Sequence, residues 1–228
     1  AAWAYEALSF GGFWAWDPVE NASLVPWLVM VGAGHVMLVF NKRGRALLST
    51  YILCILSFLL VLYSTFLTRS GILGETSVHA FTDLGMSGQL IFYMLFFVVL
   101  AIVMLAINWK KIPKENSDDS ITSREFWMFI GMLVLCISAI QITFTTSIPV
   151  INKIFGSNLA PPVEVKEHFN SWQMPIAMII ALLMAVGQFF KYKESNPKEV
   201  FKKLLLSLTI SLILAVVLIL LLKFNSIH

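Results

Sequence analysis

The sequence predicts an all-α protein, a polytopic transmembrane helical bundle with about six spans. Its 228 residues are 58% hydrophobic and have a mean hydropathy of +0.82, which is far too apolar for a soluble domain of this size. The apolar runs are continuous rather than alternating, which favours helices over the strands of a membrane barrel. Because lipid offers no water to the backbone, helices that satisfy their own backbone groups are expected.

Six runs are long enough to cross a hydrocarbon core, which takes about 20 helical residues for about 30 Å. They lie near residues 22–40, 47–67, 88–108, 125–147, 173–190 and 203–222. Most basic residues fall in the connections after the first, third and fifth runs, which are therefore expected in the cytoplasm. The segment before the first run, together with Thr68–Ser87 and Ile148–Ser171, is then expected at the outer face. We expect the cytoplasmic connections, such as Lys110–Glu125, to be solvated linkers without chemistry.

A helix start is predicted just before the first span. Asp17 suits the N-cap position, Pro18 fits the first turn, and Glu20 is placed to reach back to the backbone N–H of the cap. The sequence therefore predicts a helix that begins at Asp17. Capping explains the spacing of the two carboxylates, so we assign them no acid or base role.

Two glycines and two tryptophans, Trp14 and Trp16, precede this helix start. Glycine lets a backbone approach a flat apolar ligand, and indole faces can cover that ligand. The alternative is a belt of tryptophans at the membrane interface, which accounts for Trp27 and Trp172. A belt does not explain this density of Gly and Trp beside a capped helix, so Trp14 and Trp16 are candidate ligand-binding residues.

Three histidines are candidate metal ligands by position. His35 falls within a predicted span, where ionisable residues usually serve a function, although a neutral imidazole bonded to a neighbouring helix is the alternative. His79 lies in the polar connection after the second span, where a solvated side chain is the alternative. His168 lies in the third outer segment, and we prefer a structural role for it. Arg69 borders the same face, where it could snorkel to water or pair with a carboxylate.

The run Trp16-Asp17-Pro18-Val19-Glu20-Asn21-Ala22-Ser23 resembles the tryptophan-rich WWD signature of cytochrome c assembly proteins that handle haem. It is most similar to the CcmF-type form, and CcsA-type proteins are more distant relatives. The connection that begins Arg69-Ser70-Gly71 and continues Ser77-Val78-His79-Ala80-Phe81 is similar to the same family. CcmF-type proteins tend to have aromatic residues at the positions of Phe13 and Ala15, so the chain departs from the pattern by replacing one indole and losing one aromatic residue.

The resemblance implies a haem lyase component of cytochrome c biogenesis. Such a protein positions haem on the outer side of the membrane for thioether attachment to the Cys-x-x-Cys-His segment of apocytochrome c. It further implies that His79 is an axial ligand of an outer haem b that rests against Trp14 and Trp16, with Asp17 and Arg69 beside it. His35 would ligate a second, intramembrane haem b that acts as reductant. The partner ligands of both histidines are expected outside this chain, and no residue is assigned as catalytic.

The same resemblance implies a multi-pass protein of the bacterial inner membrane with its Trp-rich loop on the periplasmic side. Its expected partners are a CcmE-type haem chaperone, apocytochrome c and a CcmH-type thiol-presenting protein. No nucleic acid is expected as a partner. Residues 1–87 would form the haem-handling region and residues 88–228 four further transmembrane helices, as a fragment of a longer chain. Cys54 and Cys136 lie singly in apolar runs and are expected to be packing residues.

Two other classes of function stay open. A haem exporter or haem-delivery protein would share the tryptophan platform without catalysis, but it needs a polar path through the membrane. A b-type respiratory cytochrome subunit would also carry intramembrane histidine, but it usually has two such ligands, and His35 stands alone within the predicted spans.

Overall fold

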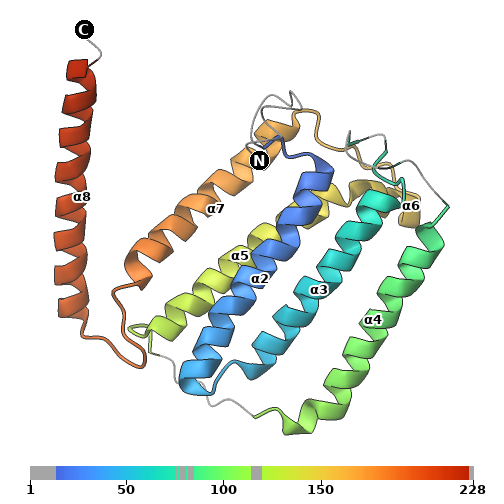
Figure 1. Ribbon diagram of the computed structural model, residues 1–228, viewed down its shortest axis with the longest axis horizontal. Helices are drawn as coiled ribbons and strands as arrows, with labels where there is room; N and C mark the ends of the chain where they lie inside the picture. The colour runs from blue at the N-terminus through green and yellow to red at the C-terminus, as the bar shows by residue number, and fades with distance from the viewer. Residues whose placement is uncertain (1–13, 75, 78–80, 82–84, 114–119, 226–228) are drawn as a thin grey trace. The chain divides into compact units, whose positions relative to one another are not determined.

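In the computed structural model the described part of the chain is all-helical; it comprises residues 14–74, 76–77, 81, 85–113 and 120–225 (Figure 1). Within these described ranges, six helices are long and apolar enough to cross a membrane, which confirms the predicted fold class. The elements are α2 (Pro18–Arg43), α3 (Leu47–Arg69), α4 (Ser87–Asn108), the short 3-10 helix η1 (Trp109–Lys111), α5 (Arg124–Thr146), α6 (Ile148–Phe155), α7 (Val165–Gly187) and α8 (Pro197–Asn225).

The chain divides into two compact units. The first comprises Ala1–Asn116 with Phe129–Ile180, and the second comprises Ser117–Met128 with Ala181–His228. The first unit contains α2, α3, α4 and α6 with most of α5 and α7. The predicted division into residues 1–87 and 88–228 concerns function rather than compactness, and it stays a prediction.

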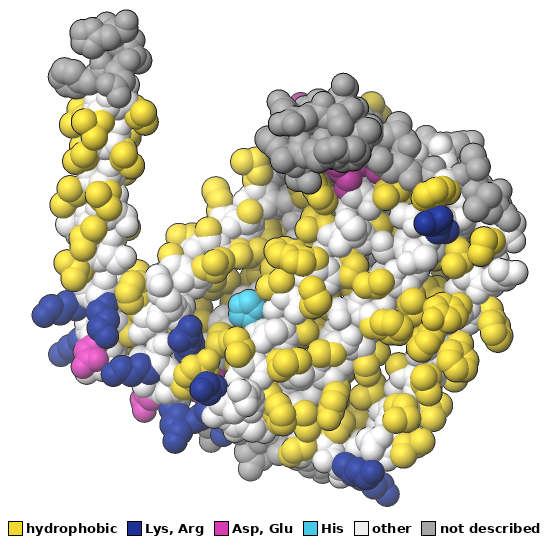
Figure 2. All heavy atoms as spheres, in the orientation of Figure 1, with side chains coloured by type: hydrophobic (Ala, Val, Ile, Leu, Met, Phe, Trp, Pro, Cys, Tyr) yellow, Lys and Arg dark blue, Asp and Glu magenta, His cyan; other side chains and the backbone are white. Residues whose placement is uncertain are grey.

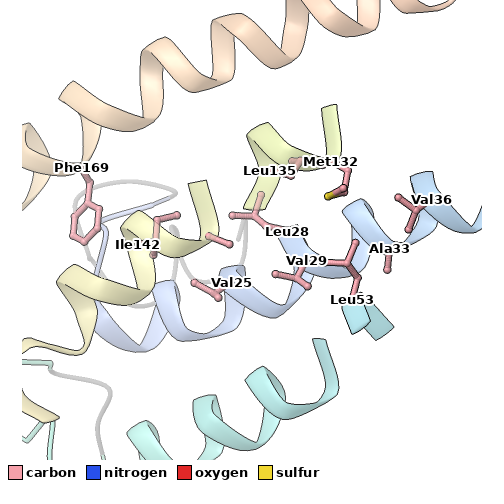
Figure 3. Packing of buried hydrophobic residues seen from close by; sticks show 11 residues of the cluster. Val25, Leu28, Val29, Ala33, Val36, Leu53, Met132, Leu135, Ile142 and Phe169 are labelled. Atoms are coloured by element: carbon pink, nitrogen blue, oxygen red, sulfur yellow. The ribbon is translucent and has the colours of Figure 1, made fainter. Parts of the chain in front are cut away.

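The core of the first unit is a row of apolar side chains between α2 and α5. Figure 3 shows this row, with the ring of Phe169 from α7 at one end of it. Val29 and Ile142 are almost wholly buried, at 2% and 0% exposed. Cys54 and Cys136 pack against the edge of this cluster, as expected for packing residues. The other buried members are Val25, Leu28, Ala33, Val36, Leu53, Met132, Leu135 and Ala139.

Helix α2 approaches α5 closely at Gly32. A Cβ atom at this position would lie 3.3 Å from Cγ of Met132, whereas a Cβ at Gly34 would meet nothing within 4 Å. Gly32 is therefore used in helix packing, and Gly34 leaves open space beside His35. In addition, α3 packs along α2 and α4 packs along α3 (Figure 1).

The outward sides of the helices are apolar, as a lipid-facing bundle requires. No residue of α4 is buried, yet its sequence is almost entirely hydrophobic. Figure 2 shows hydrophobic side chains along the helices and basic side chains near helix ends.

The segment Ile148–Ser171, expected as an outer connection, is partly helical. It contains α6, whose Ile148 and Val150 are buried, and it contains the first turns of α7. The predicted span near 173–190 therefore began too late. Hydropathy marks the apolar part of a helix, whereas the polar residues Lys166, Glu167 and His168 extend α7 beyond that part without interrupting its backbone hydrogen bonds.

In the second unit, the start of α5 is bonded to the connection between α7 and α8. Glu125 is 4% exposed, and its two carboxylate oxygens accept from the backbone N–H of Lys193 at 3.0 and 3.1 Å. The backbone N–H of Arg124 donates to the carbonyl of Lys191 at 3.0 Å. This end of the predicted linker is therefore ordered by specific hydrogen bonds, and it is not simply solvated.

The packing at Gly32 leads to a test of the α2–α5 contact. Gly32→Val should lower the free energy of unfolding by about 1–3 kcal/mol, because overpacking forces α5 away. Gly34→Val is the matched control, in the same helix but facing open space, and should change it by less than about 0.5 kcal/mol. Denaturant unfolding of the full-length protein in micelles, followed by circular dichroism, measures both. Equal effects would contradict the close contact.

Candidate functional site

The start of α2 is a complete capping box, as predicted. The Asp17 carboxylate accepts from the backbone N–H of Val19 at 2.9 Å. Glu20 accepts from the backbone N–H groups of Asp17 and Ala15, at 3.3 and 3.0 Å. Both carboxylates thus satisfy backbone donors that a helix start leaves unpaired. This agrees with their assignment as capping groups.

Trp16, the residue before the cap, has an unusual backbone. Its φ is 56°, in the left-handed region that residues other than glycine rarely adopt. Such a conformation costs about 1–3 kcal/mol, so it persists only where neighbouring contacts hold it. One of these contacts comes from Asn21, whose side-chain N–H donates to the Trp16 carbonyl at 3.0 Å.

The indole of Trp16 is held by the first turns of α7. Its ring stacks on Phe169, with 5.1 Å between centroids and 13° between planes. Its Nε1–H donates to Oδ1 of Asn170 at 2.9 Å. One face and the polar edge of this indole are therefore already in use, so Trp16 is a supporting residue in this structure.

Trp14 has different surroundings. It is 38% exposed, and its ring stands nearly perpendicular to that of Trp16, with 5.9 Å between centroids and 88° between planes. Of the two tryptophans predicted to contact haem, Trp14 therefore offers free aromatic surface and Trp16 fixes its position.

A chain of polar side chains joins α5 to α7 below the Trp16 contact. Ser138 donates to the side-chain oxygen of Gln173 at 2.6 Å, and Gln173 donates to that of Gln141 at 2.7 Å. The Gln141 amide lies 3.5 Å from the Thr145 hydroxyl, which lies 3.3 Å from Nε2 of His168. Because these groups satisfy one another, and Ser138 and Gln173 are buried, they fix the position of α7 along α5. The structure thus gives His168 a structural partner.

The segment that leads to His79 is tied to the cap. The Ser77 hydroxyl donates to Oδ2 of Asp17 at 2.7 Å, and Ser77 is 7% exposed. His79 itself lies outside the described residues. Arg69 is exposed, and its guanidinium carbon lies 4.1 Å from the centroid of the Phe81 ring. The Trp-rich start of α2, the end of α3 and the start of α7 thus converge at one end of the first unit, which we call the Asp17 end.

His35 lies in the middle of α2, well away from the Asp17 end, and is partly buried. Its Nδ1 lies 2.8 Å from the backbone carbonyl of Val31, one turn earlier. A carbonyl only accepts, so Nδ1 must carry the hydrogen and neutral His35 keeps its lone pair on Nε2. This is the arrangement typical of metal-ligating histidines, whose second nitrogen donates to a fixed acceptor.

Sequence reasoning missed the roles of Asn21, Phe169 and Asn170. All three hold Trp16, and none belongs to a residue type that by itself suggests a site. The available signal was the indole N–H of Trp16, which needs an acceptor when it is buried. The sequence does not say which acceptor is used, because Asn170 lies 154 residues away along the chain.

Comparison with known proteins shows the following similarities. The sequence model of the cytochrome C assembly protein family matches residues 1–74. CcmF of Pseudomonas fluorescens, a cytochrome c-type biogenesis protein, is 37% identical over 218 residues, which are 94% of this chain and 32% of that protein. CcmF of Escherichia coli K12 is 31% identical over 223 residues, 96% of this chain and 33% of that protein.

A solved structure, titled Cytochrome c Heme Lyase CcmF, has the same fold. It matches with a TM-score of 0.60 and 29% identity, covering 86% of this chain and 27% of the other. The chain thus spans about a third of the length of these relatives.

The hold on Trp16 can be tested by a double-mutant cycle. Trp16→Phe keeps an aromatic ring on Phe169 but removes the N–H donor, and Asn170→Ala removes its acceptor. The two changes should be coupled by about 1 kcal/mol in the free energy of unfolding of the full-length protein. Trp27→Phe combined with Asn170→Ala is the control pair and should be additive. A coupling of zero for the first pair would contradict the hydrogen bond.

Proposed function

Because this chain belongs to the CcmF-type cytochrome c biogenesis proteins, we propose that it forms the haem-holding part of a membrane-bound haem lyase. The substrate haem would lie at the Asp17 end, on the outer side of the membrane. Its vinyl groups would there be joined to the two cysteine thiols of an apocytochrome c Cys-x-x-Cys-His segment. The relatives' names support this activity, and the arrangement at Trp14 and Trp16 supports its place in the chain.

The single observation that carries the proposal is the contrast between the two tryptophans. Trp14 is 38% exposed, while Trp16 beneath it is fixed by a stack at 5.1 Å and a hydrogen bond at 2.9 Å. A flat apolar ligand gains most from an aromatic surface that is already rigid, because little side-chain entropy is then lost on binding. Trp14 fits the face of a porphyrin in this way, with Trp16 as its support.

His79 is proposed as the axial ligand of the outer haem. It belongs to the Ser-Val-His-Ala-Phe run, and Ser77 at the head of that run is bonded to Asp17. This bond ties the histidine-bearing segment to the cap that Trp16 precedes. Arg69 is proposed to pair with a haem propionate, for which an exposed guanidinium is suited. Asp17 would act through Ser77 and the cap, by fixing the edge of the site.

Attachment of each cysteine adds S–H across a vinyl double bond, so that a C–S bond forms and the proton goes to the other vinyl carbon. No electrons are gained or lost in this addition. The protein's share is to bring thiol and vinyl into register, and an effective concentration of this kind can supply several kcal/mol. Such positioning needs a rigid aromatic surface, proposed at Trp14, and an axial ligand, proposed to be His79.

His35 is proposed to ligate a resident haem b within the membrane. The residues fit such a group, because Nδ1 is engaged with Val31, Nε2 keeps its lone pair, and Gly34 beside it faces open space. When bound, a haem of this kind supplies one-electron transfer, which would keep the outer iron reduced. This chain would contribute one ligand, His35, whose Nε2 keeps its lone pair because Nδ1 carries the hydrogen.

The proposed partners follow from the family. A CcmE-type chaperone would deliver the haem, and a CcmH-type protein would present the apocytochrome thiols at the Asp17 end. The proposed location is the bacterial inner membrane, with the Asp17 end facing the periplasm. The six apolar helices support a multi-pass membrane protein.

Reconstitution of the full-length protein with its haem donor and an apocytochrome tests this proposal. Trp14→Ala should lower haem affinity about three- to tenfold, as expected for the loss of one aromatic stack, without changing the free energy of unfolding. Trp16→Ala should lower both haem affinity and stability, because it also removes the contacts with α7. Haem titration and covalent cytochrome c yield are the measurements.

Two control variants distinguish haem binding by Trp14 from simple anchoring of tryptophans at the membrane interface. Trp14→Phe keeps a flat aromatic face and should retain most of the haem affinity, and Trp27→Ala should have no effect on haem. If Trp14→Ala bound haem and formed cytochrome c normally, the assignment of Trp14 as a haem-contacting surface would be wrong. If haem bound but no covalent product formed with any donor, haem delivery would replace lyase activity as the function.

The two histidines should give separate spectroscopic losses. His35→Ala should remove the b-type absorption of the purified full-length protein and leave the outer site able to take haem. His79→Ala should do the reverse. His168→Ala is the control, since its Nε2 is engaged with Thr145, and it should keep both signals. An unchanged spectrum in either of the first two variants would refute that ligand assignment.

A further inference from the structure

The side chain of Asn21 is buried with one polar atom left over. It is 1% exposed, and its Nδ2 donates to the Trp16 carbonyl at 3.0 Å and lies 3.4 Å from the Thr146 hydroxyl. The Trp16 carbonyl can only accept, so the nitrogen is correctly assigned and the other atom is the carbonyl oxygen. This Oδ1 has no hydrogen-bond partner among the described residues. Leaving such a group unpaired is costly and therefore rare.

A small cavity lies beside Asn21, between α2, α3 and the corner where α5 meets α6. The space open to the centre of a water molecule is about 10 Å³, which suits one water. Five of its lining side chains are polar, namely Asn21, Tyr63, Thr143, Thr146 and Ser147, and the others are Ala22, Val25, Leu60 and Leu67. None of them is charged, so a neutral ligand fits.

The polar groups around the cavity can complete the hydrogen bonds of a water. The Tyr63 hydroxyl donates to Ser147 Oγ at 2.6 Å, so the Ser147 hydroxyl keeps its own hydrogen to give. The Thr143 hydroxyl donates to the carbonyl of Ala139 at 2.7 Å, which leaves its oxygen able to accept. A buried water needs two to four polar partners, and Asn21 Oδ1 needs a donor.

We propose that this cavity is a binding site for a single structural water. The water donates to Asn21 Oδ1 and bonds to the hydroxyl groups of α3 and of the α5–α6 corner. It thereby holds the amide that fixes the Trp16 carbonyl, and it ties three helices together directly below the Asp17 end. The site is independent of haem handling, since it needs only residues that are already in contact.

The direct test is a structure of the full-length protein in lipid at a resolution that shows ordered water. We expect a water within hydrogen-bonding distance of Asn21 Oδ1 and of at least one of the lining hydroxyls, which belong to Tyr63, Thr143, Thr146 and Ser147. A dry cavity would overturn the proposal. It would also be overturned if Oδ1 accepted directly from a donor elsewhere in the full-length protein.

Two matched substitutions test the site in solution. Val25→Ile adds a methylene beside the cavity and should expel the water, which strands Asn21 Oδ1. Val29→Ile adds the same methylene one turn further along α2, where the side chain is also buried but does not line the cavity. The folding equilibrium constant of Val25→Ile should be about ten times lower than that of Val29→Ile. An equal or higher constant for Val25→Ile would mean that the cavity is dry, because filling a dry cavity stabilises a core.

Discussion

The Asp17 end depends on keeping the Trp16 backbone in its left-handed conformation. A φ of 56° is unfavourable for tryptophan, and three groups, one from the first turns of α2 and two from α7, oppose that cost. Asn21 binds the carbonyl, Phe169 covers one face of the indole, and Asn170 accepts its N–H. Trp14, whose ring stands nearly perpendicular to that of Trp16, is 38% exposed beside this fixed indole. The aromatic surface proposed for haem follows from this one constraint.

The membrane explains why these supports lie where they do. Lipid penalises unpaired polar groups, so the polar side chains of α5 and α7 bond to one another from Ser138 up to His168. These hydrogen bonds fix the position of α7 along the axis of α5 and place Phe169 and Asn170 beside Trp16. At Gly32, by contrast, close apolar packing against Met132 sets the distance between α2 and α5. The same bundle thus positions the site with polar pairs and small residues.

The features predicted from the sequence were local ones. The capping box at Asp17 depends on residues within four positions, and the six spans depend on the length of apolar runs. The contacts that define the site were not predictable, because Trp16 and Asn170 are 154 residues apart and many side chains could have served as acceptor. The start of α7 was missed since its first turns are polar. The different roles of Trp14 and Trp16 follow from burial, which their spacing does not reveal.

The most direct test is a structure of the full-length protein with haem captured at the Asp17 end. We expect the porphyrin to lie in van der Waals contact with the indole of Trp14, while Trp16 keeps its stack on Phe169 and its hydrogen bond to Asn170. A porphyrin bound away from Trp14, or one that displaces Phe169 from the face of Trp16, would contradict this expectation.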